Sequence, residues 1–241
     1  MKNKHLWKPS KFVMTNRGLS ASSDLNEVGI GSRFVASIQA KAYEELINLH
    51  SFGFLLDLGC GKVPLYEVYR KHVSDNTCID WLNSSHDVKH GDYYFDLNKE
   101  LPLSSESFDT ILITDVLEHI LCADLLWSEM KRLLKPGGKI ILGVPFLYCV
   151  HESPYDYNRY TEYKLKYYCI KNNLEIVYLE PYGGAPEVIL DIIAKNLIFS
   201  KVLSNIHLFV SKLFIKSPLG KRISNSTLRK FPLGYCLVAR K

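Results

Sequence analysis

The first half of the chain contains two glycines and two aspartates whose types and spacing suit a nucleoside-binding site. Asp57 lies in a short apolar run and is followed closely by Gly59 and Gly61, while Asp80 ends the next apolar run. Because glycine has no side chain, its backbone can approach a ligand closely. An acidic residue about 20 residues further on can accept both hydroxyls of a ribose. With Asp57 attracting a cationic group, these residues predict a nucleoside ligand that carries a positive charge.

The residues that follow extend the predicted site around a purine base. Trp81 could stack on or flank an adenine, Asp96 could accept a hydrogen bond from its exocyclic amine, and Leu97 could supply an apolar wall. Pro64 stands where a dinucleotide-binding loop has its third glycine, and the Gly-Lys-Ser/Thr of a phosphate-binding loop is absent. The competing interpretation is an α/β domain without a nucleoside, in which the aspartates only form turns.

Alternating strands and helices must position these residues. Apolar runs predict strands at residues 52–58, 77–81, 108–114, 139–144, 174–179 and 232–239. Helical spacing predicts helices at residues 33–49, 64–72, 123–134 and 161–172, the last with Thr161 as its N-cap. The alternation indicates an α/β fold with a mostly parallel sheet and helices on both faces. In such a sheet the ligand lies outside the carboxyl ends of the strands.

Two regions flank this core. Residues 1–50 are expected to form an N-terminal segment, irregular over residues 1–30 and helical after it, and residues 51–241 to form the main domain. Within that domain, residues from about 186 to 230 are expected to form a basic helical insertion before the last strand.

Composition places the chain among ordinary globular proteins. It has 241 residues, of which 47% are hydrophobic and 23% charged, and this excludes disorder. The six cysteines form no CxxC pair and no His/Cys cluster of zinc-like spacing, so no metal site is predicted. Residues 1–17 are polar and lack the apolar stretch of a secretory signal. Free cysteines without such a signal indicate a cytoplasmic location.

The positive charge is concentrated near the end of the sequence. Residues 192–241 contain ten Lys/Arg and no Asp/Glu, whereas residues 1–191 contain 20 Lys/Arg against 25 Asp/Glu. The spacing between Lys195 and Lys216 predicts an amphipathic basic helix, too short to span a membrane but suited to an anionic membrane surface at the inner face. The alternative is a lid or dimer helix that packs its apolar side on protein.

Five motifs, taken together, resemble class I S-adenosylmethionine-dependent methyltransferases. They are LLDLGCG (55–61), Asp80, DLNKELPLSSESFDTI (96–111), DVLEHI (115–120) and LLKPGGKIILGVP (133–145). The resemblance implies a Rossmann-like sheet of seven strands whose last strand, near residues 235–239, is antiparallel. It implies that S-adenosyl-L-methionine is the cofactor.

The resemblance also assigns roles to the residues in these motifs. It implies that Asp57, Gly59 and Gly61 hold the methionine part of the cofactor, and that Asp80 holds the ribose. Asp96 and Leu97 would flank the adenine. Asp115 begins the turn after the central strand and would face the cofactor. For the neighbouring Glu118 and His119, the alternative role is hydrogen bonding at the start of a helix.

A second polar cluster follows the strand predicted at 139–144 and suits an acceptor. His151 is the candidate general base for an oxygen acceptor. The residues after it combine aromatic rings with charged groups, as sugar-binding sites do: Tyr155, Asp156, Arg159 and Tyr160. In the alternative interpretation, His151 and Arg159 belong to a structural hydrogen-bond network under the loop.

A narrower resemblance concerns the acceptor. VPFLYCVHESPYDYNRYTEYKL (144–165), followed by LEPYGGAPE, is similar to methyltransferase-domain proteins encoded among bacterial cell-surface polysaccharide genes. It implies O-methylation of a sugar or cell-surface glycan intermediate. The alternatives are methylation of another small molecule or of RNA, and a non-catalytic cofactor-binding protein. Nucleic acid is the less favoured partner, because no RNA-binding module is recognisable. The sequence defines neither the methylated atom nor the oligomeric state.

Overall fold

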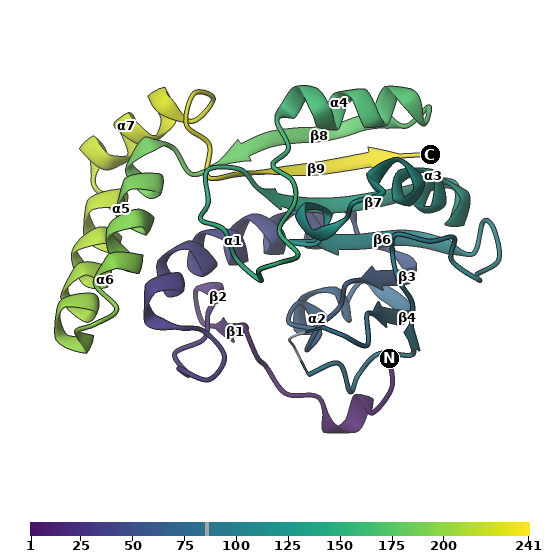
Figure 1. Cartoon of the computed structure of the whole chain (residues 1–241), viewed down its shortest axis with the longest axis horizontal. Helices are drawn as coiled ribbons and strands as arrows, with labels where there is room; N and C mark the ends of the chain where they lie inside the picture. The colour runs from purple at the N-terminus through teal and green to yellow at the C-terminus, as the bar shows by residue number, and fades with distance from the viewer. Residues whose placement is uncertain (85–86) are drawn as a thin grey trace.

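A seven-stranded sheet organises the chain, and the computed structural model describes it over residues 1–84 and 87–241. Across the sheet the strand order is β5-β4-β3-β6-β7-β9-β8 (Figure 1). In that order the strands are β5 (Tyr93–Tyr94), β4 (Val73–Asp80), β3 (Gly53–Leu58), β6 (Phe108–Thr114), β7 (Leu134–Pro145), β9 (Gly234–Arg240) and β8 (Glu175–Tyr182). β9 runs antiparallel to both of its neighbours, and the pairs from β5 to β7 are parallel. The predicted fold class is confirmed.

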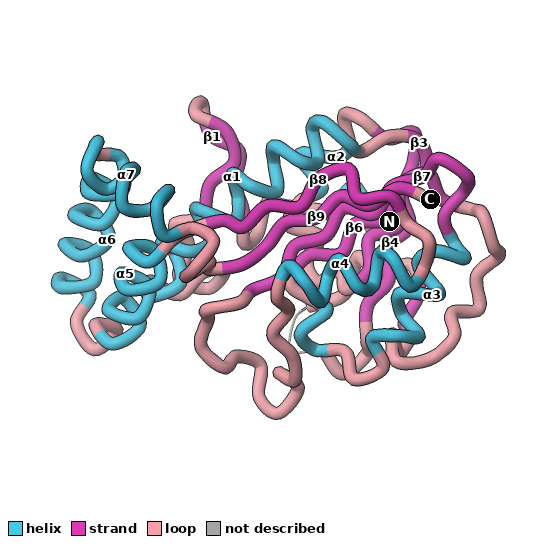
Figure 2. The backbone as a smooth tube through the Cα atoms, turned by 90° about the horizontal axis from the view of Figure 1, so that it is seen from above, coloured by secondary structure: helices cyan, strands magenta, loops and turns pink. Residues whose placement is uncertain are grey.

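Helices cover both faces of this sheet (Figures 1 and 2). α1 (Arg33–His50) and α2 (Tyr66–Tyr69) pack on one face, and α3 (Ala123–Leu133) and α4 (Glu162–Lys171) pack on the other. Between α3 and α4, the buried rings of Trp127 and Tyr168 stack with their centroids 5.3 Å apart. Thr161 caps α4 as predicted, because its side chain accepts a hydrogen bond from the Lys164 N–H.

The predicted bounds of one helix and of the strand after it were wrong; these elements are α2 and β4. The helix predicted at residues 64–72 is reduced to α2, and β4 begins at Val73 rather than at Thr77. β5 pairs only with the last two residues of β4, so the first half of β4 is an edge that leaves Ser74 and Asp75 exposed. This polar edge carries no apolar run, which explains why the sequence pattern missed it.

The first 30 residues are more ordered than predicted. They contain a hairpin of β1 (Phe12–Thr15) and β2 (Gly18–Ala21), paired antiparallel. Phe12 and Leu19 of the hairpin are buried, and the Phe12 ring meets Tyr43 of α1 edge to face at 6.4 Å. The hairpin is therefore held by α1 rather than by a strong strand pattern of its own.

Three helices form the predicted insertion at one end of the sheet: α5 (Ala185–Asn196), α6 (Lys201–Lys216) and α7 (Pro218–Thr227) (Figure 1). The buried carboxylate of Glu187 on α5 accepts hydrogen bonds from the Gly184 N–H and from the Ser224 hydroxyl of α7, both at 2.8 Å. Among the described residues, no helix combines the length and the apolar character needed to cross a membrane.

Gly143 on β7 offers a test of the packing between the sheet and α1. A Cβ at this position would lie 2.3 Å from Cε1 of Tyr43, whose hydroxyl is hydrogen-bonded to Asp115. Because this anchored ring has little room to move, we expect Gly143→Ala to lower the free energy of unfolding by about 1–3 kcal/mol. Gly29→Ala is the matched control, since Gly29 has φ −56° and no atom within 4 Å of its Cβ position. Urea denaturation measures both variants, and equal stability would contradict the packing described.

Candidate active site

A cavity of about 670 Å³ lies over the carboxyl ends of β3, β4 and β6. Its volume falls within the range of small-molecule sites, roughly 300–1,000 Å³. The sheet brings to its wall every residue that the sequence analysis placed around a cofactor: Asp57, Gly59, Gly61, Asp80, Trp81, Asp96, Leu97 and Asp115. The predicted juxtaposition is therefore present, while the individual roles of these residues toward a cofactor stay predictions.

Asp57 is the second-last residue of β3, and its carboxyl group is buried. Its Oδ2 accepts a hydrogen bond from the Tyr69 hydroxyl at 3.3 Å. Burial, assisted by the nearby charge of Asp80 and opposed by the Tyr69 hydrogen bond, raises the pKa of Asp57 to about 7. The group therefore changes charge near neutral pH, and a cation beside it would favour the ionised form.

The glycine loop is folded back onto β4. The N–H groups of Gly59 and Cys60 donate to the Ile79 carbonyl at 2.9 and 3.1 Å, and the Gly61 N–H donates to the Asp80 carboxylate. Gly59 has φ +70°, and a Cβ there would lie 2.4 Å from a methyl group of Val116. Glycine at this position is thus required by the turn and its packing as well as by space for a ligand.

Aromatic and carboxylate groups occupy the side of the cavity predicted to hold a base. The rings of Trp81 and Tyr155 meet edge to face at 5.1 Å. Burial alone would raise the pKa of Asp96, but hydrogen bonds from Asn98 and the charge of Lys99 outweigh it and lower that pKa. Asp96 consequently remains an ionised acceptor. Tyr155, predicted as an acceptor-binding residue, lies in the wall of this cavity.

The N-terminal segment contributes residues to the cavity that the sequence analysis missed. Lys11 donates to Oδ2 of Asp115 at 3.0 Å, and Lys62 of the glycine loop pairs with Glu27 at 2.9 Å. Asp115 has φ +54°. Its Oδ1 accepts hydrogen bonds from two residues of α1, the Tyr43 hydroxyl at 2.7 Å and the Gln39 amide at 3.0 Å. Asp115 lines the cavity, and its hydrogen bonds to Lys11 and to α1 fasten the N-terminal segment over the sheet.

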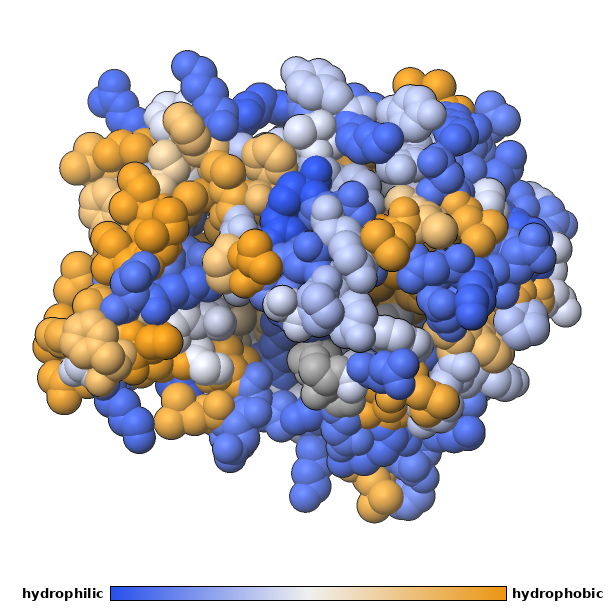
Figure 3. Space-filling model, in the orientation of Figure 1, coloured by the Kyte–Doolittle hydropathy of each residue, from blue (hydrophilic) through white to orange (hydrophobic). Residues whose placement is uncertain are grey.

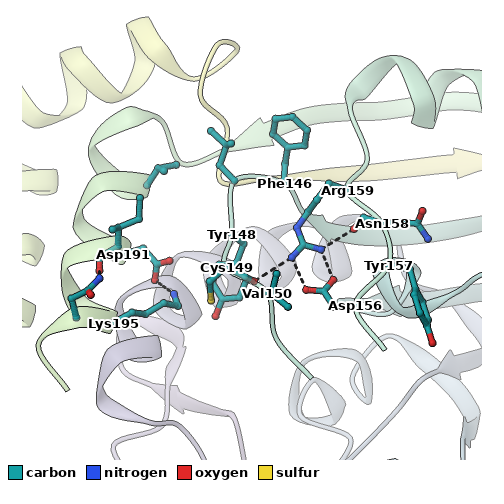
Figure 4. A pocket seen from close by; sticks show the side chains of 14 residues that line it. Phe146, Tyr148, Cys149, Val150, Asp156, Tyr157, Asn158, Arg159, Asp191 and Lys195 are labelled. Atoms are coloured by element: carbon teal, nitrogen blue, oxygen red, sulfur yellow. Dashed lines mark hydrogen bonds and ion pairs between the residues drawn. The ribbon is translucent and has the colours of Figure 1, made fainter. Parts of the chain in front are cut away.

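A second cavity, of about 640 Å³, lies between the segment after β7 and α5 (Figure 4). Arg159 and Asp156 form an ion pair on one wall, and Arg159 also donates to the Cys149 carbonyl at 3.2 Å. On the facing wall, Lys195 pairs with Asp191. Tyr157 lines both cavities, so the two adjoin. Predicted acceptor residues Asp156 and Arg159 therefore lie next to the first cavity.

His151 stands at the centre of a charged network. Its Nδ1 lies 3.2 Å from Oδ2 of Asp156. Burial disfavours the charged ring, but Glu118 and Asp156 outweigh it and raise the pKa of His151. Asp156 itself is held at a pKa of about 2, because Arg159 and the His151 N–H overcome the effect of its burial. These contacts fit the alternative interpretation, in which His151 and Arg159 belong to a structural hydrogen-bond network. The role of His151 as a general base stays a prediction.

Tyr160 does not reach either cavity, contrary to its predicted place in an acceptor site. The side chain is buried, its hydroxyl donates to the Leu117 carbonyl at 3.2 Å, and its ring packs against Tyr168. Tyr160 immediately precedes the N-cap of α4, and this position turns it into the apolar core under that helix.

Comparisons with known proteins agree with this geometry. A family model described as "Methyltransferase domain" matches residues 56–142. Ubiquinone biosynthesis O-methyltransferases from strains of Coxiella burnetii are 27% identical over 136 residues. That match covers 50% of this chain and 58% of the relatives' length.

Solved structures share the fold at low sequence identity. An S-adenosylmethionine-dependent methyltransferase from Archaeoglobus fulgidus has a TM-score of 0.58 at 16% identity, covering 87% of this chain and 97% of its own. One from Mesorhizobium loti has a TM-score of 0.55 at 12% identity, covering 86% and 100%. The cyclase SpnF also matches, with a TM-score of 0.53 at 19% identity over 84% of this chain and 81% of its own.

The fold is that of class I methyltransferases, and residues 56–142 match the family model described as "Methyltransferase domain". The family match and the shared fold together support S-adenosyl-L-methionine as the cofactor. The cavity fits that group, because a buried carboxyl at Asp57 can meet a cationic amine and a second at Asp80 can meet a ribose. The rings of Trp81 and Tyr155 complete the pocket for a base.

The raised pKa of Asp57 predicts how cofactor affinity depends on pH. If only the ionised carboxylate holds the cationic amine, affinity for S-adenosyl-L-methionine falls about 10-fold from pH 8 to pH 6. Asp57→Asn should bind roughly 10- to 100-fold more weakly and lose this pH dependence. Asp75→Asn, at an exposed position of β4, is the control. Isothermal titration calorimetry measures the affinities, and a flat profile in the unmodified protein would contradict the assignment.

Proposed function

We propose that the protein transfers the methyl group of S-adenosyl-L-methionine to an oxygen of a sugar or cell-surface glycan intermediate. The observation that carries the proposal is the cavity at the carboxyl ends of β3 and β4, where Asp57 and Asp80 flank the glycine loop. A nucleoside with a cationic end matches this arrangement of carboxylates. The Asp57 and Asp80 side chains are buried, so the cavity can hold such a ligand out of bulk water.

The chemistry requires alignment more than activation. Bound S-adenosyl-L-methionine supplies an electrophilic sulfonium methyl group. In the transfer the methyl carbon–sulfur bond breaks, a carbon–oxygen bond forms and S-adenosylhomocysteine is released, while the proton of the acceptor hydroxyl passes to a base, for which His151 is the candidate. The protein holds donor and acceptor in line, with Asp57 and Asp80 fixing the donor and the adjoining second cavity receiving the acceptor.

The second cavity supports a hydroxyl-rich acceptor. Its walls combine the Arg159–Asp156 and Lys195–Asp191 pairs with the ring of Tyr148 (Figure 4). Carboxylates and guanidinium groups can bind hydroxyls, and an aromatic ring can pack on the C–H face of a sugar. That the curated relatives are named as O-methyltransferases supports an oxygen acceptor. RNA and non-catalytic cofactor binding remain the alternatives, because one fold hosts many activities.

Methyl transfer can be tested with tritium-labelled S-adenosyl-L-methionine and separate pools of glycan precursors and RNA. We expect label in the glycan pool with the unmodified protein and with Asp75→Asn, and a large loss with Asp57→Asn. His151→Gln should keep its cofactor affinity but lose turnover, since His151 lies on the acceptor side. Label in RNA alone would replace the proposed acceptor, and cofactor binding without transfer to any pool would indicate a non-catalytic protein.

We further propose that the helical insertion contacts an anionic membrane. α6 turns Ser204 and Ser211 inward, while its apolar residues Val202, Leu203, Ile206, Phe209, Val210 and Leu213 are each at least 43% exposed. The alternative is a lid or dimer helix whose apolar side packs on protein. Figure 3 shows the apolar surface over α5, α6 and α7, interrupted by hydrophilic side chains.

The charge of the insertion also suits an anionic membrane. Lys201, Lys212 and Lys216 are exposed on α6, and no acidic residue follows Asp191 in the sequence. These positive charges can attract anionic lipid headgroups.

Liposome co-sedimentation tests this contact. The protein should bind vesicles that contain anionic phosphatidylglycerol more strongly than neutral phosphatidylcholine vesicles, and added salt should weaken the binding. Phe209→Asp should reduce binding, whereas Ile170→Asp on α4, also at an exposed apolar position, should not. If vesicles are not bound and Phe209→Asp instead dissociates a dimer in sedimentation velocity, the face is an interface between two copies of the chain.

A further inference from the structure

Three potential metal ligands meet between the two cavities. Glu118 and His119 lie in the short 3-10 helix Leu117–His119, and His151 lies in the segment after β7. One carboxylate oxygen and one ring nitrogen from each histidine all lie within 4.8 Å of one another. The sequence analysis predicted no metal site, since residues 118–119 and 151 are far apart in the chain and have no zinc-like spacing.

Glu118 is a buried carboxylate that lacks hydrogen bonds. Its exposed fraction is 0%, and neither oxygen has a hydrogen-bond partner among the described residues. Its Oε1 lies 3.6 Å from Nε2 of His151 and 3.9 Å from Nε2 of His119. A buried charge without close partners is costly, and a cation between these three atoms would remove that cost.

The separations between these atoms suit a bound ion. In a tetrahedral site with metal–ligand bonds of about 2.0–2.1 Å, neighbouring ligand atoms lie roughly 3.4 Å apart. The two distances from Oε1 of Glu118, 3.6 and 3.9 Å, are close to this value and longer than a hydrogen bond. All three ligand atoms lie within 4.8 Å of one another, so adjustment of the side chains on binding would bring them to these separations.

Both histidines are oriented as metal ligands are. Nδ1 of His119 lies 2.8 Å from the Tyr155 carbonyl, and Nδ1 of His151 lies 3.2 Å from Asp156 Oδ2 and 3.3 Å from the Cys149 carbonyl. Carbonyl oxygens only accept hydrogen bonds, so each Nδ1 carries a proton. When a metal ion displaces any proton on Nε2, the Nε2 lone pair of each ring is directed toward the ion beside Glu118. Donation of the second ring N–H to a carboxylate or a carbonyl is the usual support of a metal-bound histidine.

The surrounding backbone holds this arrangement in place. The Glu118 carbonyl accepts hydrogen bonds from the N–H groups of Tyr157 and Asn158 at 2.9 and 3.0 Å. The Asn158 amide donates to the Ile120 carbonyl at 2.8 Å. These bonds tie the segment after β7 to the helix that carries Glu118 and His119, so the ligands from both parts are fixed relative to each other.

We infer that Glu118, His119 and His151 form a binding site for a divalent transition-metal ion at the edge of the cofactor cavity. Two imidazoles and one carboxylate favour zinc, iron or manganese over magnesium or calcium, which prefer all-oxygen sites. Three protein ligands leave a coordination position open. Because His119 lines the cofactor cavity, an ion held here adjoins the place where the proposed function puts the acceptor oxygen. Metal binding itself does not depend on that function.

The site is tested with the metal alone on full-length protein stripped with a chelator. Calorimetric titration with zinc chloride, and loss of the free manganese signal in electron paramagnetic resonance, should each report about one ion per chain. Glu118→Gln and His151→Asn should each weaken binding by more than about 100-fold. Asp156→Asn removes no proposed ligand but weakens the support of His151 together with the Arg159 pair, and should weaken binding by about 10- to 100-fold. His72→Gln, at an exposed histidine, should bind like the unmodified protein.

Circular dichroism and cofactor calorimetry on the same samples establish that the variants are folded. Glu118→Gln keeps the side-chain size, and His151→Asn changes a partly exposed position, so at least one folded variant is expected. Absence of stoichiometric binding in the unmodified protein, or unchanged binding in both folded ligand variants, would overturn the inference. Failure of methyl transfer with intact metal binding would contradict only the proposed function.

Discussion

The parallel pairing of β3 with β4 is the constraint on which the candidate site depends. Asp57 pairs with Cys78 and Leu58 with Ile79, so the two strands end side by side. The Ile79 carbonyl then accepts hydrogen bonds from the N–H groups of Gly59 and Cys60, and the Asp80 carboxylate accepts one from the Gly61 N–H. One backbone register thereby sets the turn, the two carboxylates and the floor of the cavity. A shift by one residue would turn Asp57 to the opposite face of the sheet.

The charges around this floor divide the site into two halves with different electrostatics. On the cofactor side, burial keeps Asp57 close to its point of ionisation near neutral pH, so its charge responds to a cationic ligand. Beside the second cavity, Arg159 keeps Asp156 ionised, and Asp156 in turn lies against the His151 ring. The buried Glu118 lies between the halves, with its Oε1 3.6 and 3.9 Å from the Nε2 atoms of His151 and His119. A positively charged donor and a polar acceptor can therefore be held by separate groups.

The cofactor half was predictable because its residues follow directly from strand ends. LLDLGCG places Asp57 and two glycines at one strand end, and the next apolar run places Asp80 at the neighbouring end. The contacts made by the N-terminal segment and on the acceptor side depend instead on distant pairs. Lys11 meets Asp115 across 104 positions in the sequence, and nothing in the local pattern signals that contact. The burial of Tyr160 was equally hidden from the local pattern, since it depends on packing under α4.

A crystal structure with S-adenosylhomocysteine, the demethylated form of the cofactor, tests the central claim most directly. The nucleoside should lie in the cavity over the glycine loop, with its ribose hydroxyls within hydrogen-bonding distance of Asp80, its adenine beside Trp81 and its amine beside Asp57. The account would be contradicted if the ligand bound elsewhere, or bound here with its ribose and amine away from both aspartates.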